Sequence, residues 1–403
     1  MSTGADQRVE LGSLGLESGA HLLVKRALAR CAVGEELAVS GSAPALAVHL
    51  RAWARMQGHG FCDAQSADHV ARLRRGDAQS GRWRGAQRAG VADAKVPGAV
   101  VDAPAPHWGL AARGARVEAG SPGFEFALAS KPQVWADEAA GLYREGVVAQ
   151  WNPETAIPWD APATHADDLE DALVQVLTYL IENETAALLV FARFAAQMHP
   201  HFREVLQLLS IQSADEARHI EVFTRRALLR RNELGLSTAG GQASLKTLVD
   251  EPDFALASFL LSVLGEGSFV NLLWFLHEYA PDACTAAIMK LTAQDEARHV
   301  AFGVAHLARH VQHDPALRER LATAIERRHE ALRESAGLNE EVFDALLLLA
   351  AGGWEPAALE RGHAAVVALL TQMHTGRRNR LRILGFDAER ADRLSGLHTR
   401  NFM

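Results

Sequence analysis

Apolar residues recur one helical turn apart through most of the chain after residue 133, and polar residues occupy the opposite faces. Pro200, the segment 235–241 with its three glycines, and Pro281 interrupt this pattern. Because proline and glycine tend to end helices, the interruptions predict separate helices. We predict four long helices, at residues 166–197, 201–234, 252–279 and 282–313.

Before residue 77 the apolar runs are shorter and predict strands and helices in alternation. We expect the order β-α-β-α-β in a small two-layer domain, with the second helix running from Pro44 to Gln57. The mixed sequence that follows is typical of a linker, with one or two short strands near 115–128. The predicted organisation is mainly α: an α/β domain at 1–76, a linker at 77–132, a four-helix bundle at 133–315 and a C-terminal helical extension at 316–403.

The sequence Asp-Glu-Ala-Arg-His occurs twice, 80 residues apart, at 215–219 and 295–299. The Glu and the His of each copy are three residues apart, so both side chains lie on one face of a helix. This spacing lets the pair reach one metal centre. A single Glu-x-x-His occurs often by chance, but two five-residue matches, each inside an apolar helix, are a specific signal.

A bundle that binds two metals in this way needs one more carboxylate from each of two other helices. In the helix before the first motif, Glu184 lies on the more apolar face and Glu182 on the more polar one, so we assign Glu184. In the helix before the second motif, Glu266 is the only acid in the first half. The glycines at 265 and 267 indicate either space or a distorted backbone beside the metal, or close helix packing.

Four glutamates and two neutral histidines in a dry bundle would be very costly alone, because each unpaired buried carboxylate costs many kcal/mol. Two divalent cations cancel four carboxylates, and oxygen and nitrogen ligands suit iron or manganese better than structural zinc. The alternative is two solvated Glu- and Arg-rich helix faces with two accidental core acids. Trp151 and Trp159 precede these helices, and they either line a route to the metals or cap the bundle.

Residues from about 135 to 315 resemble the ferritin-like di-iron carboxylate superfamily, and the two motifs are more similar to its oxygenase and oxidase branches than to storage ferritins. The resemblance implies a ferritin-like four-helix bundle with two iron ions, a Mn/Fe pair being the alternative. It implies catalytic glutamates and a ligand set of Glu184, Glu216, His219, Glu266, Glu296 and His299. It also implies that Asp215 and Asp295 each accept a hydrogen bond from the ligating histidine of the other motif, with Arg218 and Arg298 nearby.

Residues 8–75 resemble the TusA/SirA-like sulfur-carrier family, through GLESGAHLLVKRAL and VGEELAVSGSAPALAVHLRAWARMQGHGF. That family carries a persulfide on a Cys-Pro pair after Gly-Leu, whereas this chain has Ser18 and Gly19 there. A serine hydroxyl cannot hold a persulfide, so we expect a docking or regulatory role. Cys31 is predicted to be a core thiol, and sulfur chemistry through Cys62 is the alternative.

The chain has 403 residues, is 48% hydrophobic and 22% charged, and has a net charge of −8. These values are ordinary for a globular protein and disfavour a nucleic-acid partner or a cationic membrane protein. The start lacks a basic segment followed by an apolar run, and no apolar stretch reaches the roughly 18–20 residues of a membrane span. With three cysteines at unrelated spacings, the expected location is the cytoplasm.

These features predict an enzyme: a di-iron oxidoreductase that activates O₂ to hydroxylate, N-oxygenate or desaturate a small organic substrate. The sequence has no glycine-rich dinucleotide motif and no P-loop. We therefore expect electrons from a ferredoxin, a reductase or the substrate, and a homodimer is compatible with this interpretation. One alternative is an iron-binding or peroxide-detoxifying ferritin-like protein. The other is a sulfur-metabolism protein that binds a partner through the TusA-like domain.

Overall fold

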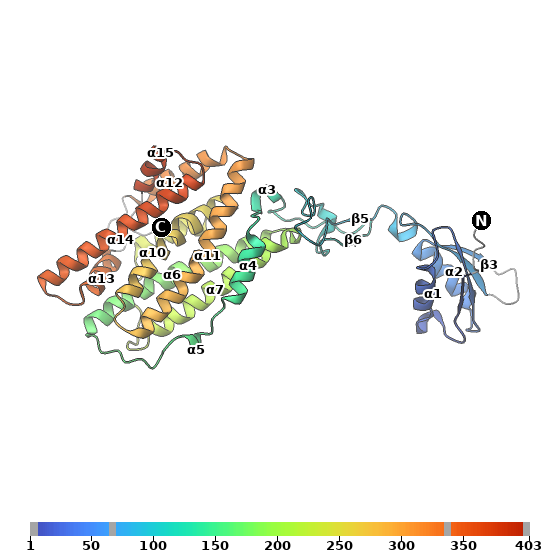
Figure 1. Cartoon of the computed structure of the whole chain (residues 1–403), viewed down its shortest axis with the longest axis horizontal. Coiled ribbons are helices and arrows are strands. Elements are labelled where there is room, and N and C mark those ends of the chain that lie inside the picture. Colours follow the sequence, from blue (N-terminus) through green and yellow to red (C-terminus); the bar gives the residue numbers. More distant parts are fainter. Residues whose placement is uncertain (1–6, 64–69, 334–339, 398–403) are drawn as a thin grey trace. The chain divides into compact units, whose positions relative to one another are not determined.

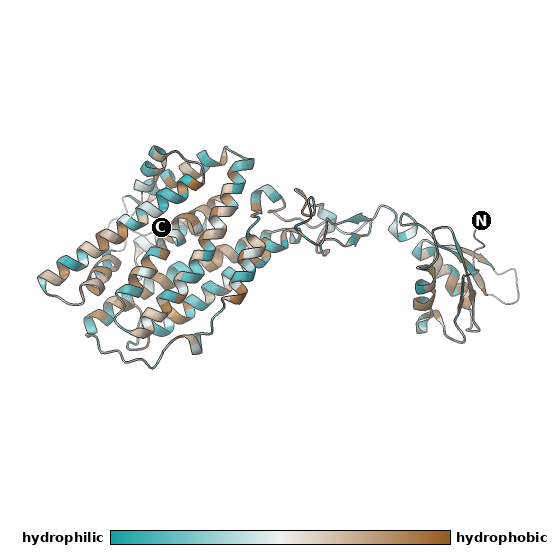
Figure 2. Ribbon diagram, in the orientation of Figure 1, coloured by the Kyte–Doolittle hydropathy of each residue, from teal (hydrophilic) through white to brown (hydrophobic). Residues whose placement is uncertain are grey.

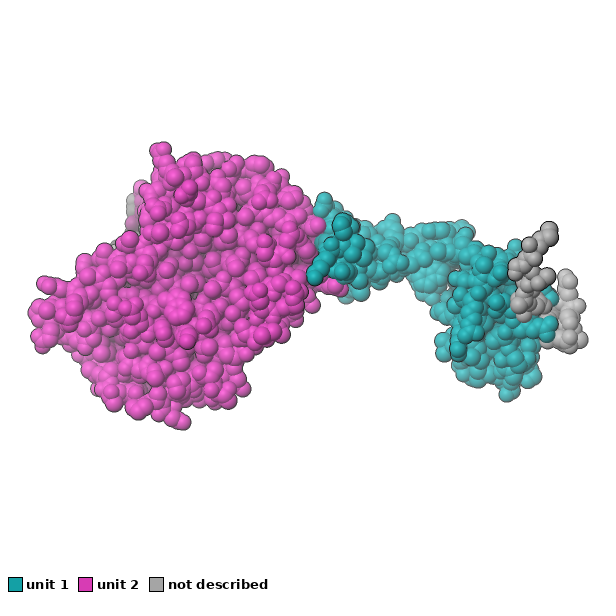
Figure 3. Space-filling view, in the orientation of Figure 1, with its two compact units in different colours: residues 1–125 teal, residues 126–403 magenta. Residues whose placement is uncertain are grey.

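The computed structural model describes residues 7–63, 70–333 and 340–397. The chain divides into two compact units, residues 1–125 and 126–403, which Figure 3 shows in different colours. The chain is mainly helical, as predicted, and the strands of the described residues all lie in the first unit.

The first unit begins with a four-stranded sheet and two helices (Figure 1). In chain order these elements are β1 (Gln7–Glu10), α1 (Ala20–Leu28), β2 (Glu36–Ser40), α2 (Leu46–Gln57), β3 (Gly60–Asp63) and β4 (Ala71–Arg74). The strand order is β1-β2-β4-β3, with β1 parallel to β2 and β4 antiparallel to both of its neighbours. Leu37 and Val39 of β2 share a buried core with Val24 of α1 and Leu50 of α2.

Two details of this domain differ from the prediction. The sheet has one more strand, β4, and α2 begins at Leu46, after Pro44. Ala45 has a φ of 56°, in the left-handed region, so Pro44 lies in a turn before the helix. Ser18 ends a short 3₁₀ helix, η1 (Leu16–Ser18), directly before α1. The likeness to sulfur carriers stays a prediction.

The rest of the first unit contains short elements: η2 (Gly81–Trp83), β5 (Gln87–Arg88), η3 (Pro106–Trp108) and β6 (Arg116–Val117). Strands β5 and β6 pair antiparallel. The predicted range for short strands contains β6, but its partner β5 lies in the Arg- and Gly-rich stretch before it.

A bundle of long helices forms the core of the second unit (Figure 1). Helix α6 (Asp167–Gln197) packs on α7 (Arg203–Ala227), and α10 (Gly267–Glu278) packs on α11 (Ala283–His313), which also contacts α7. Shorter elements connect to the bundle: α3 (Lys131–Val134), α4 (Ala139–Val148), α5 (Pro153–Ala156) and η4 (Pro200–Phe202). Figure 2 shows apolar and polar residues interspersed along these helices, as amphipathic helices require.

The third predicted helix, 252–279, is not uniform. It consists of α9 (Phe254–Ser258), a π-helical segment η5 (Phe259–Glu266) and α10. A π-helix forms hydrogen bonds five residues apart and is frequent at functional sites. Asp253 caps the start of α9, accepting a hydrogen bond from the Leu256 N–H at 3.0 Å.

The second predicted helix, 201–234, was too long. Helix α7 ends at Ala227, and a helix that the sequence did not predict, α8 (Ala239–Val249), follows. The segment between them is bonded to α6: the Gly235 N–H donates to Thr178 Oγ1 at 2.7 Å, and the Leu236 N–H donates to Gln175 Oε1 at 2.8 Å. These two hydrogen bonds hold the connecting segment against α6.

The predicted C-terminal extension is helical. It consists of α12 (Leu317–Leu332), α13 (Glu340–Ala351), α14 (Pro356–Ile383) and α15 (Ala388–Gly396). Helix α13 packs on α6, and α14 packs on α10 and η5. The extension therefore contacts two of the elements that supply acids to the interior of the bundle.

Two helical stretches, Asp167–Gln197 and Phe254–Glu278, are long and apolar enough to cross a membrane by length and composition alone. The bent pair Glu340–Ala351 and Pro356–Ile383 would add a third. The expectation that no stretch reaches this length was therefore wrong. The apolar windows of the first two are 67% and 83% buried within the chain, so packing among the helices accounts for their composition.

Candidate metal centre

The six side chains predicted to bind metal lie together inside the bundle, and each is at most 5% exposed. They come from four elements, α6, α7, η5 and α11. They form two overlapping groups, within which the ligand atoms lie no more than 4.8 Å apart. The groups are Glu184, Glu216, His219 and Glu296, and Glu216, Glu266, Glu296 and His299. Glu216 and Glu296 belong to both groups, so each could contribute to two neighbouring metal sites.

The Nδ1 atom of each histidine faces the glutamates. His219 Nδ1 lies 3.5 Å from an oxygen of Glu184 and of Glu216, and 3.3 Å from Glu296. His299 Nδ1 lies 3.0 Å from Glu216, 3.5 Å from Glu296 and 3.8 Å from Glu266. The two imidazoles therefore approach the shared carboxylates from opposite ends of the cluster, with their ring centres 6.5 Å apart.

The other nitrogen of each histidine contacts an aspartate of the opposite motif. His219 Nε2 lies 3.1 Å from Asp295, and His299 Nε2 lies 3.3 Å from Asp215. A proton on Nε2 that is donated to the carboxylate leaves the Nδ1 lone pair free to bind a metal. Arg218 links the two aspartates, with hydrogen bonds of 2.6 Å to Asp215 and 2.8 Å to Asp295. Arg298 pairs with Asp295 alone.

Two further residues belong to this network: Gln150, which was not predicted, and Trp151, which was expected to line a route to the metals or to cap the bundle. Trp151 Nε1 donates to Asp295 at 2.8 Å, and Gln150 Nε2 donates to Asp215 at 2.6 Å. The Arg218 guanidinium also lies 4.6 Å from the Trp151 ring centre. Trp151 is thus a hydrogen-bond partner of the site, whereas Trp159 donates to the Pro153 carbonyl and stacks under Arg225. Gln150 and Trp151 follow α4 directly, and no local sequence pattern indicates that they contact the aspartates.

Burial raises the pKa values of Glu184 and Glu266, and the charges of neighbouring glutamates raise them further. Burial also acts to raise the pKa of Glu216, but the contacts with Glu184 and both imidazoles outweigh it and lower that pKa. For both histidines burial acts to lower the pKa, but the surrounding carboxylates raise it well above the usual value. These directions show that the four carboxylates can be buried together only with compensating protons or cations.

The donor atoms fit two metal ions. Both oxygens of Glu216, Glu266 and Glu296, Oε1 of Glu184 and Nδ1 of both histidines are buried without a hydrogen-bond partner. Buried polar atoms are nearly always satisfied, so nine such atoms in one place indicate a ligand. Four carboxylates balance two divalent cations, and carboxylate with imidazole suits iron and manganese. The cluster is therefore able to hold a two-metal site.

Glu266 ends the π-helical segment η5, and α14 contacts this segment from outside. Arg380 Nε donates to the Val263 carbonyl at 2.6 Å. Its guanidinium lies against Gly267, where an added Cβ would be 2.4 Å from Arg380 Cζ. The glycine pair thus combines both predicted explanations: the backbone is distorted, and Gly267 permits close packing. Gly265 lines a cavity beside the metal cluster.

That cavity has a volume of about 20 Å³, enough for roughly one water molecule. Glu184, Glu266 and Glu296 form its polar side. Ala187, Leu261 and Phe269 belong to its apolar side. The cavity is therefore a small space that three of the four clustered glutamates line.

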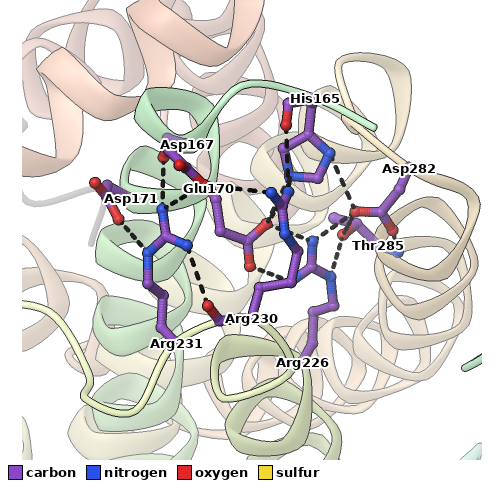
Figure 4. Close-up of polar contacts among 9 residues, drawn as sticks. All are labelled: His165, Asp167, Glu170, Asp171, Arg226, Arg230, Arg231, Asp282 and Thr285. Carbon is purple, nitrogen blue, oxygen red and sulfur yellow. Dashed lines mark hydrogen bonds and ion pairs between the residues drawn. The ribbon is translucent and has the colours of Figure 1, made fainter. Parts of the chain in front are cut away.

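A separate buried group, His165, Glu170 and Asp282, also has metal-binding spacing. Arg226 already fills it (Figure 4), with hydrogen bonds of 2.7 and 3.0 Å to Glu170 and another to Asp282. Since this guanidinium neutralises the carboxylates, the group is an ion-pair network that ties α6, α7 and the start of α11 together.

No family model matches the sequence, and no curated protein matches it. Solved structures that match include R2-like ligand-binding oxidases. One is a variant with an aerobically reconstituted Mn/Fe cofactor, 17% identical to this chain with a TM-score of 0.49. The alignment covers 62% of this chain and 98% of that variant. The enzyme from Sulfolobus acidocaldarius is 20% identical, with a TM-score of 0.42, covering 62% of this chain and 92% of its own.

Proposed function

We propose that this chain is a non-haem di-iron oxidoreductase that uses O₂ to oxidise a small organic substrate by hydroxylation, N-oxygenation or desaturation. The observation that carries the proposal is the set of nine unpartnered ligand atoms on the four glutamates and two histidines. Ferrous ions bound here would supply electrons and Lewis acidity for the reduction of O₂. A Mn/Fe pair fits the same donor atoms.

The protein residues then have separate roles. The six side chains would hold two ions and balance their charge, and Asp215 and Asp295 would hold the imidazoles in the tautomer whose Nδ1 is free to ligate. The small cavity beside Glu184 and Glu266 gives O₂ an apolar approach to the cluster through Ala187 and Leu261. A space this small would keep bulk water away from the reaction and so limit side reactions.

The proposal extends to partners and location. The sequence contains no dinucleotide or phosphate-binding motif, which supports an external electron donor such as a ferredoxin or reductase. The three cysteines are unpaired, and Cys31 and Cys284 are buried, which supports a reducing compartment such as the cytoplasm.

For the first domain we propose descent from a sulfur carrier and a present role in docking. Support comes from the quoted sequence stretches and from the place of Ser18, which lies just before α1 where a persulfide cysteine would be. Cys31 is buried and burial raises the pKa of its thiol, which lowers its reactivity.

The test is the stoichiometry of iron oxidation. Full-length protein would be loaded with Fe(II) in the absence of oxygen. It would then be mixed with O₂ in the presence of Fe(II) in excess over the protein. We expect oxidation of about two irons per chain, followed by a stop until a reductant is added. Continued oxidation of tens of irons per chain with mineral growth would support the storage alternative, and absence of bound iron would exclude both.

A further inference from the structure

Glu266 differs from the other three glutamates of the cluster in the backbone that carries it. Glu184, Glu216 and Glu296 lie in α-helices, whereas Glu266 ends the π-helical segment η5. Both carboxylate oxygens of Glu266 lack a hydrogen-bond partner, and His299 Nδ1 lies 3.8 Å away, beyond hydrogen-bonding distance. The position of this carboxylate therefore depends on where the backbone of η5 lies.

Helix α14 contacts this backbone on both sides of the glutamate. Before it, the Val263 carbonyl accepts a hydrogen bond from Arg380 Nε at 2.6 Å. After it, Ser268 Oγ accepts a hydrogen bond from Arg377 Nη1 at 3.2 Å. Ser268 Oγ in turn donates to the Leu264 carbonyl at 2.8 Å. The two arginines are three residues apart on one face of α14, so together they hold both ends of the turn that carries the glutamate.

The Arg380 guanidinium fits closely between two glycines. An added Cβ would lie 2.4 Å from Arg380 Cζ at Gly267 of α10, and 3.1 Å from Arg380 Nη1 at Gly376 of α14. Because neither position has a side chain, α10 and α14 approach closely enough for Arg380 to reach the Val263 carbonyl. Both glycines are thus explained by the place of this one guanidinium.

Two arginines are a costly way to fill this space. Arg377 is 5% exposed and its Nε has no partner, and Nη2 of Arg380 has none either. Among the described residues no carboxylate pairs with either guanidinium. Burial lowers the pKa of Arg377 to about 9 and that of Arg380 to about 10, so both stay charged at neutral pH. Apolar side chains would cost less here, so the hydrogen bonds to η5 are what distinguish these two residues.

We propose that Arg380 is a positioning residue of the metal centre, which fixes η5 so that the Glu266 carboxylate reaches its metal, with Arg377 in support. Glu266 belongs to only one of the two ligand groups, the one that also contains Glu216, Glu296 and His299. Loss of the restraint should therefore weaken this metal position and spare the other. The inference rests on the metal centre of the proposed function, but not on the reaction performed there.

The test is anaerobic titration of full-length, metal-free protein with Co(II), followed by visible absorption and by metal content after desalting. We expect wild-type protein to bind about two ions per chain. Arg380→Met fills the same space without an N–H donor. It should keep one ion at nearly wild-type affinity and bind the other about 10–100-fold more weakly, as when a group that orients a ligand is lost. The absorption of the weaker ion should change as well, because its ligands change.

Two further variants separate the hydrogen bond from general effects. Arg380→Lys keeps a charged N–H donor on a long side chain, so it should restore part of the lost affinity. Arg378→Met changes an arginine of the same helix that pairs with Asp392 at 3.6 Å, and it should bind both ions as wild type does. A purely structural role of Arg380 would change the stability measured by urea unfolding, with no selective loss of one ion.

Two ions bound at wild-type affinity by Arg380→Met would overturn the inference and leave the metal centre intact. Equal weakening of both ions would also overturn it, since only one ligand group contains Glu266. Failure of the wild-type protein to bind metal would contradict the proposed function itself. If Arg380→Met does not fold, Arg377→Met decides: unchanged binding of both ions in that variant would contradict a role of α14 at the metal centre.

Discussion

His219 of the first motif contacts Asp295 of the second, with 3.1 Å between Nε2 and Oδ2. The same Asp295 oxygen also accepts hydrogen bonds from Arg218 and Trp151, both at 2.8 Å. The equivalent contact joins His299 of the second motif to Asp215 of the first, at 3.3 Å. The further donor to this aspartate is Gln150 in place of a tryptophan. The two motifs thus orient each other's ligands, and the two metal positions have different surroundings.

The first prediction concerns this contact. Asp295→Asn keeps the shape of the side chain but removes the charge that holds the His219 tautomer. We expect metal affinity to fall by about 10–100-fold, measured by anaerobic Fe(II) titration against a competing chelator. Trp151→Phe loses one hydrogen bond and keeps the ring beside Arg218, so its effect should be smaller. Unchanged affinity in Asp295→Asn would show that the contact does not tune the ligand.

The second prediction separates two glutamates on one helix. Glu184 faces the metal cluster and is 3% exposed, whereas Glu182 is only partly buried and belongs to neither metal-binding group. Glu184→Ala should reduce bound metal to well below two ions per chain, because a ligand and a balancing charge are lost. Glu182→Ala should keep about two ions. Metal content would be measured by plasma emission, and equal loss in both variants would contradict the assignment of Glu184.

The gathering of the six side chains could be predicted because it depends on helical periodicity. Glu216 with His219, and Glu296 with His299, share a helix face through their spacing, and the apolar neighbours of Glu184 mark its buried face. The cost of burying four acids then required cations. Helical spacing, the polarity of a helix face and the number of buried acids are local properties, so a single sequence is enough to predict them.

The remaining features depend on contacts between segments far apart in the chain. Thr178 and Gln175 of α6 bind the backbone of Gly235 and Leu236, in the segment between α7 and α8. Trp151 reaches Asp295 across 144 residues, and Arg380 reaches Val263 across 117 residues. Helical periodicity does not say which distant segment a polar side chain contacts, so only the three-dimensional structure reveals these pairings.

The third prediction concerns Ser18. The full-length chain, incubated with a cysteine desulfurase and cysteine, should not gain a sulfur atom, because the position before α1 has a hydroxyl. Intact mass spectrometry would show this, with peptide mapping of Cys31 and Cys62. Ser18→Cys is the informative counterpart, since a carrier-like domain should then accept sulfur. Labelling of Cys62 in the original chain would show that sulfur chemistry has moved there.

The fourth prediction concerns the network of Figure 4. Burial acts to raise the pKa values of Glu170 and Asp282. Hydrogen bonds outweigh burial in both cases. Those from Arg226 and His165 lower the pKa of Glu170 below the usual 4.5. Those from the Thr285 backbone and Arg226 lower the pKa of Asp282 below the usual 3.8. A carboxylate with a lowered folded-state pKa stabilises the fold above its unfolded pKa, and this contribution is lost as the pH falls through the folded value. Wild-type stability should therefore fall as the pH drops below about 5.

Arg226→Met removes the cation that both buried carboxylates share, although Glu170 keeps Arg230 at 3.6 Å, and it should cost about 3–5 kcal/mol at pH 7. The difference from wild type should shrink towards pH 4, because protonation then neutralises the acids in the variant. Urea unfolding at several pH values measures both effects. Arg231→Met, which removes an exposed pairing with Asp171, should have a much smaller effect throughout. A loss in Arg226→Met that is independent of pH would show that packing, not charge, explains it.

The fifth prediction uses the contact between Gly267 and Arg380. Glycine to alanine inside a helix ordinarily stabilises a protein by about 1 kcal/mol. At Gly267 the added Cβ would lie 2.4 Å from Arg380 Cζ, and Arg380 is held in place by its hydrogen bond to Val263. We expect Gly267→Ala to destabilise the fold by about 1–3 kcal/mol. Gly141→Ala in α4, where no atom lies within 4 Å of the added Cβ, should be neutral or stabilising.

The double variant Gly267→Ala/Arg380→Ala tests the cause. Without the guanidinium the methyl group has room, so the cost of Gly267→Ala should largely disappear in the Arg380→Ala background. The coupling free energy between the two changes should then be about 1–3 kcal/mol, from urea unfolding of all four proteins. Additive effects would mean that the two residues do not restrain each other.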